Sequence, residues 1–240
     1  MKAVVLAGGK GRRLAPYTAV FPKPLIPLGD RPILDIIIRQ LIHYDFQDII
    51  LSVGHLAELI QAYFENCSID FLHSRLTYIK ESEPMGTAGS LGLVPDLNHT
   101  FVVMNGDILT SMDYSKLVDY HKEKGGILTI GMHKKTVKIE LGVIETDGDG
   151  ILNGYIEKPE NAYMVSMGVY VYESSVLDYI ERGVYLDFPD LVLRLMNSGE
   201  RVVGYPCEDH WLDIGRHEDY GLAQTEFERM KDTFLPASPK

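Results

Sequence analysis

The chain has 240 residues, of which 45 % are hydrophobic and 24 % are charged, and its formal net charge is −11. This composition is typical of a globular protein with a sizeable core, and no apolar run approaches the roughly 18 residues that a membrane-spanning helix needs. The acidic balance argues against a nucleic acid as the partner.

The first half of the chain alternates short apolar runs with amphipathic segments. The apolar runs predict buried parallel strands, and apolar positions at helical spacing predict the helices between them. Such an alternation favours an α/β fold with a doubly wound, mostly parallel sheet, whose ligands bind at the carboxyl ends of the strands. Because Gly8 and Asp107 each follow a predicted strand, we expect both to face one cleft. The predicted strands are 2–7, 48–53, 76–80 and 101–105, and the predicted helices are 32–44, 55–66 and 115–126.

After residue 126 the pattern changes to short strands and turns. The sequence DGDG at 147–150 is typical of a hairpin turn and lacks the remaining ligand spacing of a calcium loop. No linker or internal repeat divides the chain, so we predict one continuous domain. The predicted strands are 127–133, 141–146, 151–158, 164–173 and 201–206; helices are predicted at 174–182, 187–197 and from 217, and a frayed tail at 234–240.

The spacing of the cysteines and histidines argues against a metal site and a disulfide. Cys67 and Cys207 have no metal-like spacing, and the eight histidines are scattered singly. We therefore expect two idle thiols and a reducing, cytoplasmic location.

The loop after the first strand combines glycines with basic residues. Gly8, Gly9 and Gly11 allow a tight turn whose N–H groups point at an anion. Residues 1–29 contain five Lys or Arg and no Asp or Glu, although the rest of the chain is strongly acidic. A positive loop on an acidic protein favours a small phosphorylated ligand.

Two known glycine loops do not fit this segment. A dinucleotide fingerprint needs a third glycine where Leu14 stands, which argues against an NAD-dependent oxidoreductase. A P-loop needs Lys and then Ser or Thr after its last glycine, whereas Arg12 and Arg13 follow Gly11. A purely structural turn remains an alternative, but it explains neither the basic residues nor Lys23 between two prolines.

The segment GGKGRRLAPYT…PKPL resembles the signature loop of the sugar-1-phosphate nucleotidylyltransferases, with Arg12 in place of the usual threonine. The resemblance extends over roughly residues 2–220, and it implies a nucleotide-diphospho-sugar transferase fold. It divides the single domain 1–240 into a nucleotide-binding part at about 1–126 and a sugar-phosphate-binding part at about 127–220. It also gives Arg13 and Lys23 catalytic roles as clamps on the phosphates.

The segment EPMGTAG at 83–89 resembles the part of the family that reads the base, and its GTAG form is more similar to guanylyltransferases. From the residues alone, GTAG is a small-residue helix start that admits a flat base. The resemblance thus implies GTP as the nucleotide. The implied nucleotide-binding residues are Leu6, Ala7, Gly8, Gly9, Gly11, Arg12, Arg13, Glu83, Pro84, Gly86, Thr87, Asn105 and Gly106.

Two carboxylates resemble the metal ligands of the family. Asp107 lies in NGDI after a buried strand, and Asp213 lies in WLDIG. A carboxylate at the end of a buried strand needs a partner, for which Mg²⁺ is suitable. The alternatives are a helix cap for Asp107 and a surface turn for Asp213.

The second half contains the implied sugar-phosphate site. EKP at 157–159 resembles the segment in which Glu157 contacts sugar hydroxyls and Lys158 the phosphate; taken alone it would be an exposed hairpin end. Ser166 stands where the family usually has asparagine. The implied sugar-phosphate-binding residues are Gly142, Glu157, Lys158, Ser166 and Gly168.

The implied reaction is attack of a hexose or heptose 1-phosphate on the α-phosphorus of an NTP. Asp107, the third implied catalytic residue, and Asp213 hold Mg²⁺, and no general base is required. A catalytically silent nucleotide-sugar sensor or regulatory subunit is the alternative. Expected partners are these two substrates, with neither nucleic acid nor membrane. The apolar face around 174–195 is compatible with a homo-oligomer.

Overall fold

Seven strands form the central sheet of the structure, a computed structural model that describes residues 1–71 and 73–235. β1 pairs in parallel with β4 and with β6, β4 with β5, and β12 with β8, whereas β11 runs antiparallel to both of its neighbours. The sheet is therefore mostly parallel, as predicted. Its order is β12 (Val202–Cys207), β8 (Leu128–Lys138), β11 (Glu160–Tyr172), β6 (Phe101–Asn105), β1 (Lys2–Ala7), β4 (Asp48–Val53) and β5 (Arg75–Lys80).

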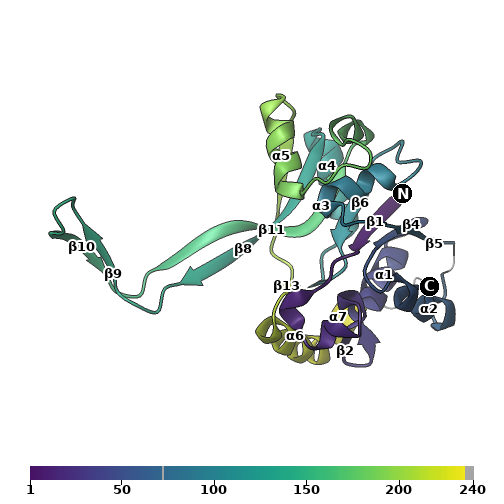
Figure 1. Ribbon diagram of the computed structural model, residues 1–240, viewed down its shortest axis with the longest axis horizontal. Helices are drawn as coiled ribbons and strands as arrows, with labels where there is room; N and C mark the ends of the chain where they lie inside the picture. Colours follow the sequence, from purple (N-terminus) through teal and green to yellow (C-terminus); the bar gives the residue numbers. More distant parts are fainter. Residues whose placement is uncertain (72, 236–240) are drawn as a thin grey trace.

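Helices cover both faces of this sheet (Figure 1). Three small two-stranded sheets complete the fold: β2 (Pro27–Leu28) with β3 (Arg31–Pro32), β7 (Ile108–Thr110) with β13 (Trp211–Asp213), and β9 (Val143–Thr146) with β10 (Leu152–Ile156). None of the helices within the described residues is long and apolar enough to cross a membrane. The α-helices are α1 (Ile33–His43), α2 (Ala57–Asn66), α3 (Gly86–Gly89), α4 (Tyr114–Lys124), α5 (Phe188–Asn197), α6 (His217–Arg229) and α7 (Lys231–Phe234).

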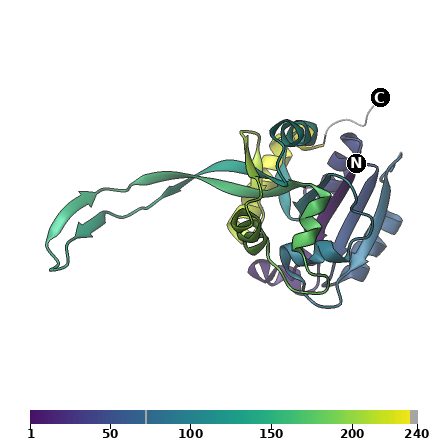
Figure 2. The same ribbon diagram turned by 90° about the horizontal axis from the view of Figure 1, so that it is seen from above.

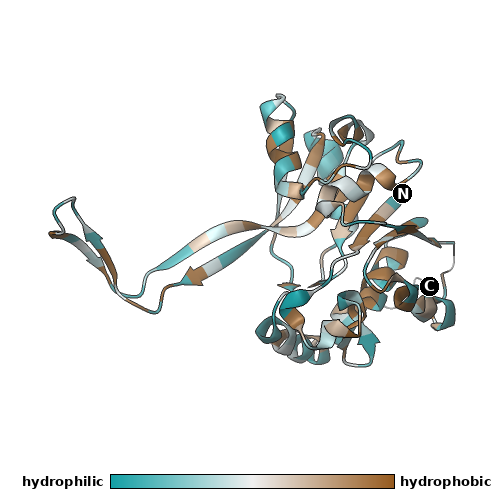
Figure 3. Cartoon of the chain, in the orientation of Figure 1, coloured by the Kyte–Doolittle hydropathy of each residue, from teal (hydrophilic) through white to brown (hydrophobic). Residues whose placement is uncertain are grey.

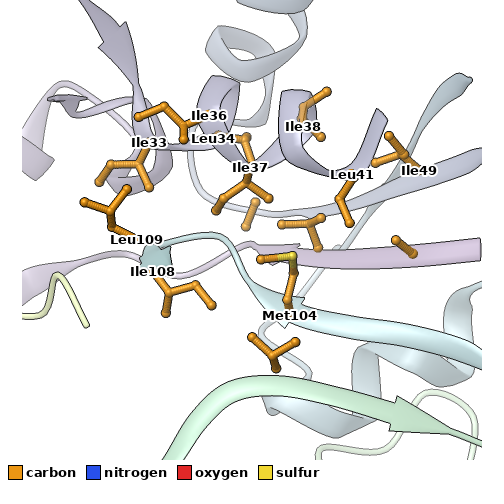
Figure 4. Packing of buried hydrophobic residues seen from close by; sticks show 14 of the residues in the cluster. Ile33, Leu34, Ile36, Ile37, Ile38, Leu41, Ile49, Met104, Ile108 and Leu109 are labelled. Carbon is orange, nitrogen blue, oxygen red and sulfur yellow. The ribbon is translucent and has the colours of Figure 1, made fainter. Parts of the chain in front are cut away.

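Successive residues of the central strands pack into two different hydrophobic clusters, because their side chains point alternately to opposite faces of the sheet. Ala3 and Val5 of β1 pack into the cluster that contains α1, whereas Val4 packs into the cluster that contains α5. Figure 4 shows the first cluster, with the isoleucines and leucines of α1 lying over β1 and β6. Burial on both faces explains why these strands are continuous apolar runs.

Most predicted elements are present, with some changes of extent. Pro32 precedes α1 as its N-cap rather than being its first residue. The predicted helix at 174–182 is a 3₁₀ helix at Ser174–Tyr179. The turn at 147–150 joins β9 to β10, and the Asp147 carboxylate accepts bonds from the backbone N–H groups of Asp149 and Ile151. The predicted frayed tail begins too early, because Phe234 ends α7 and is buried. From residue 236 on, the tail lies outside the described residues.

The largest departure from expectation is an arm formed by residues 134–164. β8 and β11 continue as a paired ribbon beyond the sheet, and β9 and β10 form its tip (Figures 1 and 2). In both views the arm projects away from the body. The alternation of apolar and polar residues predicts strands here, but it does not indicate whether other elements pack against the two faces of these strands. Figure 3 shows hydrophobic segments on the arm as well as in the body.

Candidate functional site

The glycine loop begins where β1 ends, at the carboxyl edge of the sheet. The backbone of Gly8 lies against Gly54, and a Cβ on Gly8 would come 2.9 Å from Glu81 Oε1, so a side chain there would displace the Glu81 carboxylate. Gly11 has a φ of +58°, which favours glycine, and its carbonyl accepts a 2.9 Å bond from the Thr18 hydroxyl. The loop is thus held in shape by contacts on both sides.

A cavity of about 620 Å³ opens beside this loop. Its wall combines the ends of β1 and β6, the start of α3, the part of β11 where the arm joins the body, and β13. Gly8 and Asp107 both line it, which agrees with the expectation that they face one cleft. Of the residues implied by the resemblance, the cavity is lined by Leu6, Ala7, Gly8, Gly9, Arg13, Lys23, Pro84, Gly86, Thr87, Asn105, Asp107, Ser166, Gly168 and Asp213.

Lys23 lies at the base of this cavity and is only 7 % exposed. It occupies a 3₁₀ helix, Lys23–Leu25, whose start is fixed by the flanking prolines Pro22 and Pro24. Its ammonium group donates to the carboxylate of Asp107 in an ion pair. A buried lysine requires such a partner, because an unpaired ammonium group would lose its hydration without compensation.

Asp213 is brought next to Asp107 by the pairing of β7 with β13. That pairing sets Asp213 opposite Ile108, and the Ile214 N–H donates to the Asp107 carbonyl at 3.1 Å. Burial, followed by the negative charge of Asp107, raises the pKa of Asp213, while Lys23 and Arg13 act in the opposite direction. The four charged groups therefore share one electrostatic environment.

Two neighbouring carboxylates suit Mg²⁺, which typically binds one or two carboxylates together with substrate phosphates and water. Burial, and then repulsion from Asp107, raise the pKa of Asp213, and the positive charge of a cation between the two carboxylates would offset both effects. No group of three His, Cys, Asp or Glu side chains able to hold a metal occurs within residues 1–71 and 73–235. The donor set therefore fits a metal that binds together with a phosphorylated ligand.

The opposite end of the cavity is built around the first residues of α3. The Gly86 backbone, with a φ of +76°, lies so close to Leu186 that a Cβ would be 2.4 Å from its carbonyl oxygen. The rings of Tyr170 and Phe188 stack with centroids 4.0 Å apart. Ser90 Oγ is buried and has no hydrogen-bond partner among the described residues. This end thus offers a flat apolar wall and a free hydroxyl group.

Several implied site residues lie outside the cavity lining. Arg12 and Glu83 are exposed, Gly11 shapes the loop from behind, and the Gly106 N–H donates to the Leu6 carbonyl at 2.9 Å, which ties β6 to β1. Gly142, Glu157 and Lys158 lie farther away, on the arm. The structure therefore does not bring these three to the cavity of their own chain.

Several residues that line the cavity were not predicted from the sequence. Glu81 is the most polar of them: it accepts bonds from Ser52 Oγ at 2.8 Å and from the Met85 N–H at 3.1 Å. Its position directly after β5, at the carboxyl edge of the sheet, could have drawn attention to it. The others had no comparable signal; they are Pro24, Ser90, Ile108, Met167, Tyr170, Tyr185, Phe188, Pro189 and Trp211.

Comparison with known proteins gives a family match over nearly the whole chain. The profile of the family described as nucleotidyl transferase matches residues 2–229. A UTP–glucose-1-phosphate uridylyltransferase of Synechocystis sp. is 36 % identical, and a mannose-1-phosphate guanyltransferase of Candida albicans is 31 % identical; the alignments cover 93 % and 92 % of this chain. The chain spans 62 % of the length of either relative.

Among solved structures, HddC from Yersinia pseudotuberculosis has a similar fold, with a TM-score of 0.70 and 25 % identity. The match covers 94 % of this chain and 99 % of that one. The similarity therefore includes most of the architecture described above.

Proposed function

The chain belongs to the nucleotidyl transferase family, and on this premise we propose that it transfers a nucleotidyl group from an NTP to a sugar 1-phosphate. The observation that carries the proposal is the meeting of Arg13, Lys23, Asp107 and Asp213 beside the glycine loop in one cavity. Two cations and a pair of carboxylates, placed at the carboxyl edge of an α/β sheet, suit the reaction of two phosphorylated substrates with a divalent metal.

In this reaction an oxygen of the sugar phosphate forms a bond to the α-phosphorus of the NTP. The bond from that phosphorus to the bridging oxygen breaks, and pyrophosphate leaves with the electron pair. The nucleophile is already an anion near neutral pH, so no side chain has to remove a proton. Catalysis then depends on position and charge, which are the functions of Arg13 and Lys23.

Asp107 and Asp213 are the residues that would hold Mg²⁺. When bound, the metal supplies positive charge at the phosphate oxygens. The ion pair with Lys23 holds the Asp107 carboxylate in place at the cavity wall. Lys23 in turn stays close to the position that the transferring phosphate takes.

We take GTP as the nucleotide. Guanine presents two adjacent N–H donor groups on its pairing edge, whereas uracil and thymine present one. Glu81, whose carboxylate lines the cavity, is an acceptor suited to such a pair, and Ser90 Oγ adds a further polar group. The relatives named above act on different nucleotides, so the choice of GTP rests on these side chains and on the GTAG segment.

The test is a pyrophosphate-release assay with Mg²⁺ that crosses ATP, GTP, CTP, UTP and dTTP with a panel of hexose and heptose 1-phosphates. We expect release with GTP and one sugar phosphate, and loss of release in Asp107→Asn. Nucleotide binding without release for any pair would contradict the proposal and favour the sensor alternative. Release with UTP or dTTP only would retain the reaction and overturn the choice of base.

A further inference from the structure

The arm exposes an unusual amount of apolar surface. Ten of the twenty exposed large hydrophobic side chains among the described residues lie within residues 134–164, although the arm is a small part of the chain. Six are concentrated at the tip, where each is at least half exposed: Leu141, Ile144, Ile151, Leu152, Tyr155 and Ile156. So many exposed apolar side chains within one short segment are typical of an interaction surface.

The arm has no packing partner within its own chain. β9 pairs only with β10 in the described residues, and the two perpendicular views show both strands away from the body (Figures 1 and 2). An isolated two-stranded ribbon is marginally stable in water at best. A second surface against the tip would remove its apolar side chains from water.

The cavity has too few cationic side chains to neutralise the phosphates of two phosphorylated substrates. Its lining contains the cations Arg13 and Lys23 and the carboxylates Glu81, Asp107 and Asp213, and Lys23 is already paired with Asp107. A metal ion would offset the carboxylates, but the phosphate of the sugar would still meet no cation of its own. Ser166 and Gly168, which the resemblance assigns to the sugar phosphate, line the cavity, and its two cations Arg13 and Lys23 come from the segment after β1.

The arm of the same chain cannot supply that cation in this conformation. Ser166, at the cavity wall, and Glu160 are six residues apart on one continuous strand, a distance of about 20 Å along the ribbon. Lys158 lies beyond Glu160, toward the tip. Its ammonium group is therefore far from the part of β11 that lines the cavity, Ser166–Tyr170.

We infer that the arm of one chain lies across the cavity mouth of a second copy, and that the exchange is reciprocal in a two-fold symmetric dimer. The apolar tip then packs against the exposed apolar residues that flank the mouth, Val20 and Phe21 before Lys23, and Val184 beside Tyr185. Lys158 of each arm reaches the sugar phosphate in the partner's cavity. The role of Lys158, and the charge argument that directs the arm to the cavity, rest on the proposed function; the apolar contacts of the tip do not.

The first test measures mass by light scattering after size-exclusion chromatography. Ile139 N–H donates to the Pro159 carbonyl at 3.1 Å, so residues 140–158 can be replaced by an Asn-Gly turn that keeps the base of the ribbon. We expect a dimer of 27.0 kDa chains for the wild type, a monomer for the shortened arm, and a dimer for the control Lys122→Ala on the exposed side of α4. A monomeric wild type or a dimeric shortened chain would overturn the inference.

The second test uses heterodimers of an Asp107→Ala chain and a Lys158→Ala chain, purified through two different tags. With exchanged arms, the intact cavity of the second chain receives the intact arm of the first, so about half of the wild-type activity returns while each homodimer is nearly inactive. No recovery would overturn action between chains, and a fully active Lys158→Ala homodimer would overturn the role of Lys158. An arm-dependent dimer without any transferase activity would instead refute the proposed function and leave the exchange standing.

Discussion

Lys23 and Asp107 form an ion pair at the base of the cavity, although 84 residues separate them in the sequence. The pair joins the loop after β1 to the turn after β6, and these strands are neighbours in the sheet. Each residue thus holds the other in place beside the glycine loop. The expected effects of removing either partner follow from this arrangement.

Asp107→Asn should lower kcat by about 10²–10³, because the amide keeps the shape of the side chain but not its charge. Lys23→Met and Arg13→Ala should lose a comparable factor, since each removes a cation from the transferring phosphate. Steady-state pyrophosphate release measures the loss, and circular dichroism shows whether the fold is intact. Wild-type turnover in any of the three folded variants would contradict its assigned role.

Glu81→Gln should reduce the preference for GTP over UTP, because the amide replaces one acceptor oxygen with a donor. We expect kcat/KM for GTP to fall by about tenfold to a hundredfold, the usual range of one good hydrogen bond to a base. Ser52→Ala is the matched control, since its hydroxyl contacts Glu81 without lining the cavity. An unchanged GTP-to-UTP ratio in Glu81→Gln would remove Glu81 from base recognition.

Gly86→Ala and Gly9→Ala should separate stability from ligand binding. A Cβ at Gly86 would be 2.4 Å from the Leu186 carbonyl oxygen, and an alanine there would have to keep the φ of +76°. We therefore expect a loss of about 1–3 kcal/mol in the free energy of unfolding. A Cβ at Gly9 meets nothing within 4 Å. Gly9→Ala should therefore retain the wild-type Tm and weaken nucleotide binding, as measured by calorimetry. Equal Tm values for both variants would contradict this reading of the two backbones.

Gln40→Leu should destabilise the fold without touching the cavity. The buried Gln40 amide donates to the carbonyls of Thr110 and Phe234 at 2.7 and 2.8 Å, and its oxygen accepts from Tyr114 OH at 3.0 Å. Leucine would leave three buried polar groups without this partner, so we expect a cost of at least about 2 kcal/mol. Urea unfolding measures the loss. The exposed Gln47→Leu serves as a control, and similar midpoints for the two variants would disprove the effect.

Cys207 should react slowly with thiol reagents. Burial, and then the nearby Asp209 carboxylate, raise the pKa of the Cys207 thiol to about 11. Because the thiolate is the reactive form, its fraction at pH 8 is lower by about a hundredfold than for an ordinary thiol, and the rate should rise with pH toward 11. Labelling of a Cys67→Ser variant with a disulfide reagent isolates this thiol. Fast labelling at pH 8 would show that Cys207 is more accessible than the structure indicates.

The sheet could be predicted because its strands are buried on both faces and therefore appear as unbroken apolar runs. β1, β4 and β6 have the predicted bounds, and the position of Gly8 and Asp107 after two of these strands placed them at one edge. Contacts between distant segments could not be read in this way. The stacking of Tyr170 on Phe188 depends on the packing of β11 against α5.

The arm was missed for a related reason. Residues 141–158 alternate as strands do, and strand propensity does not distinguish a ribbon that lies on a core from one that extends into solvent. The resemblance placed Glu157 and Lys158 at the sugar phosphate, and that expectation now depends on where the tip of the arm docks. The 3₁₀ helix at Ser174–Tyr179 likewise reflects local packing rather than sequence period.

The order of strands in the central sheet bears on how the chain folds. β1 lies between β4 and β6, and its register pairs Lys2 with Asp48 on one side and with Phe101 on the other. During synthesis, β1 can therefore pair with β6 only after about a hundred further residues have been added. The pairing of β6 with β11 needs a further stretch of chain. Pairings between such distant segments slow folding and leave apolar edges open to other chains meanwhile. Slow expression at low temperature therefore favours recovery of native protein over aggregates.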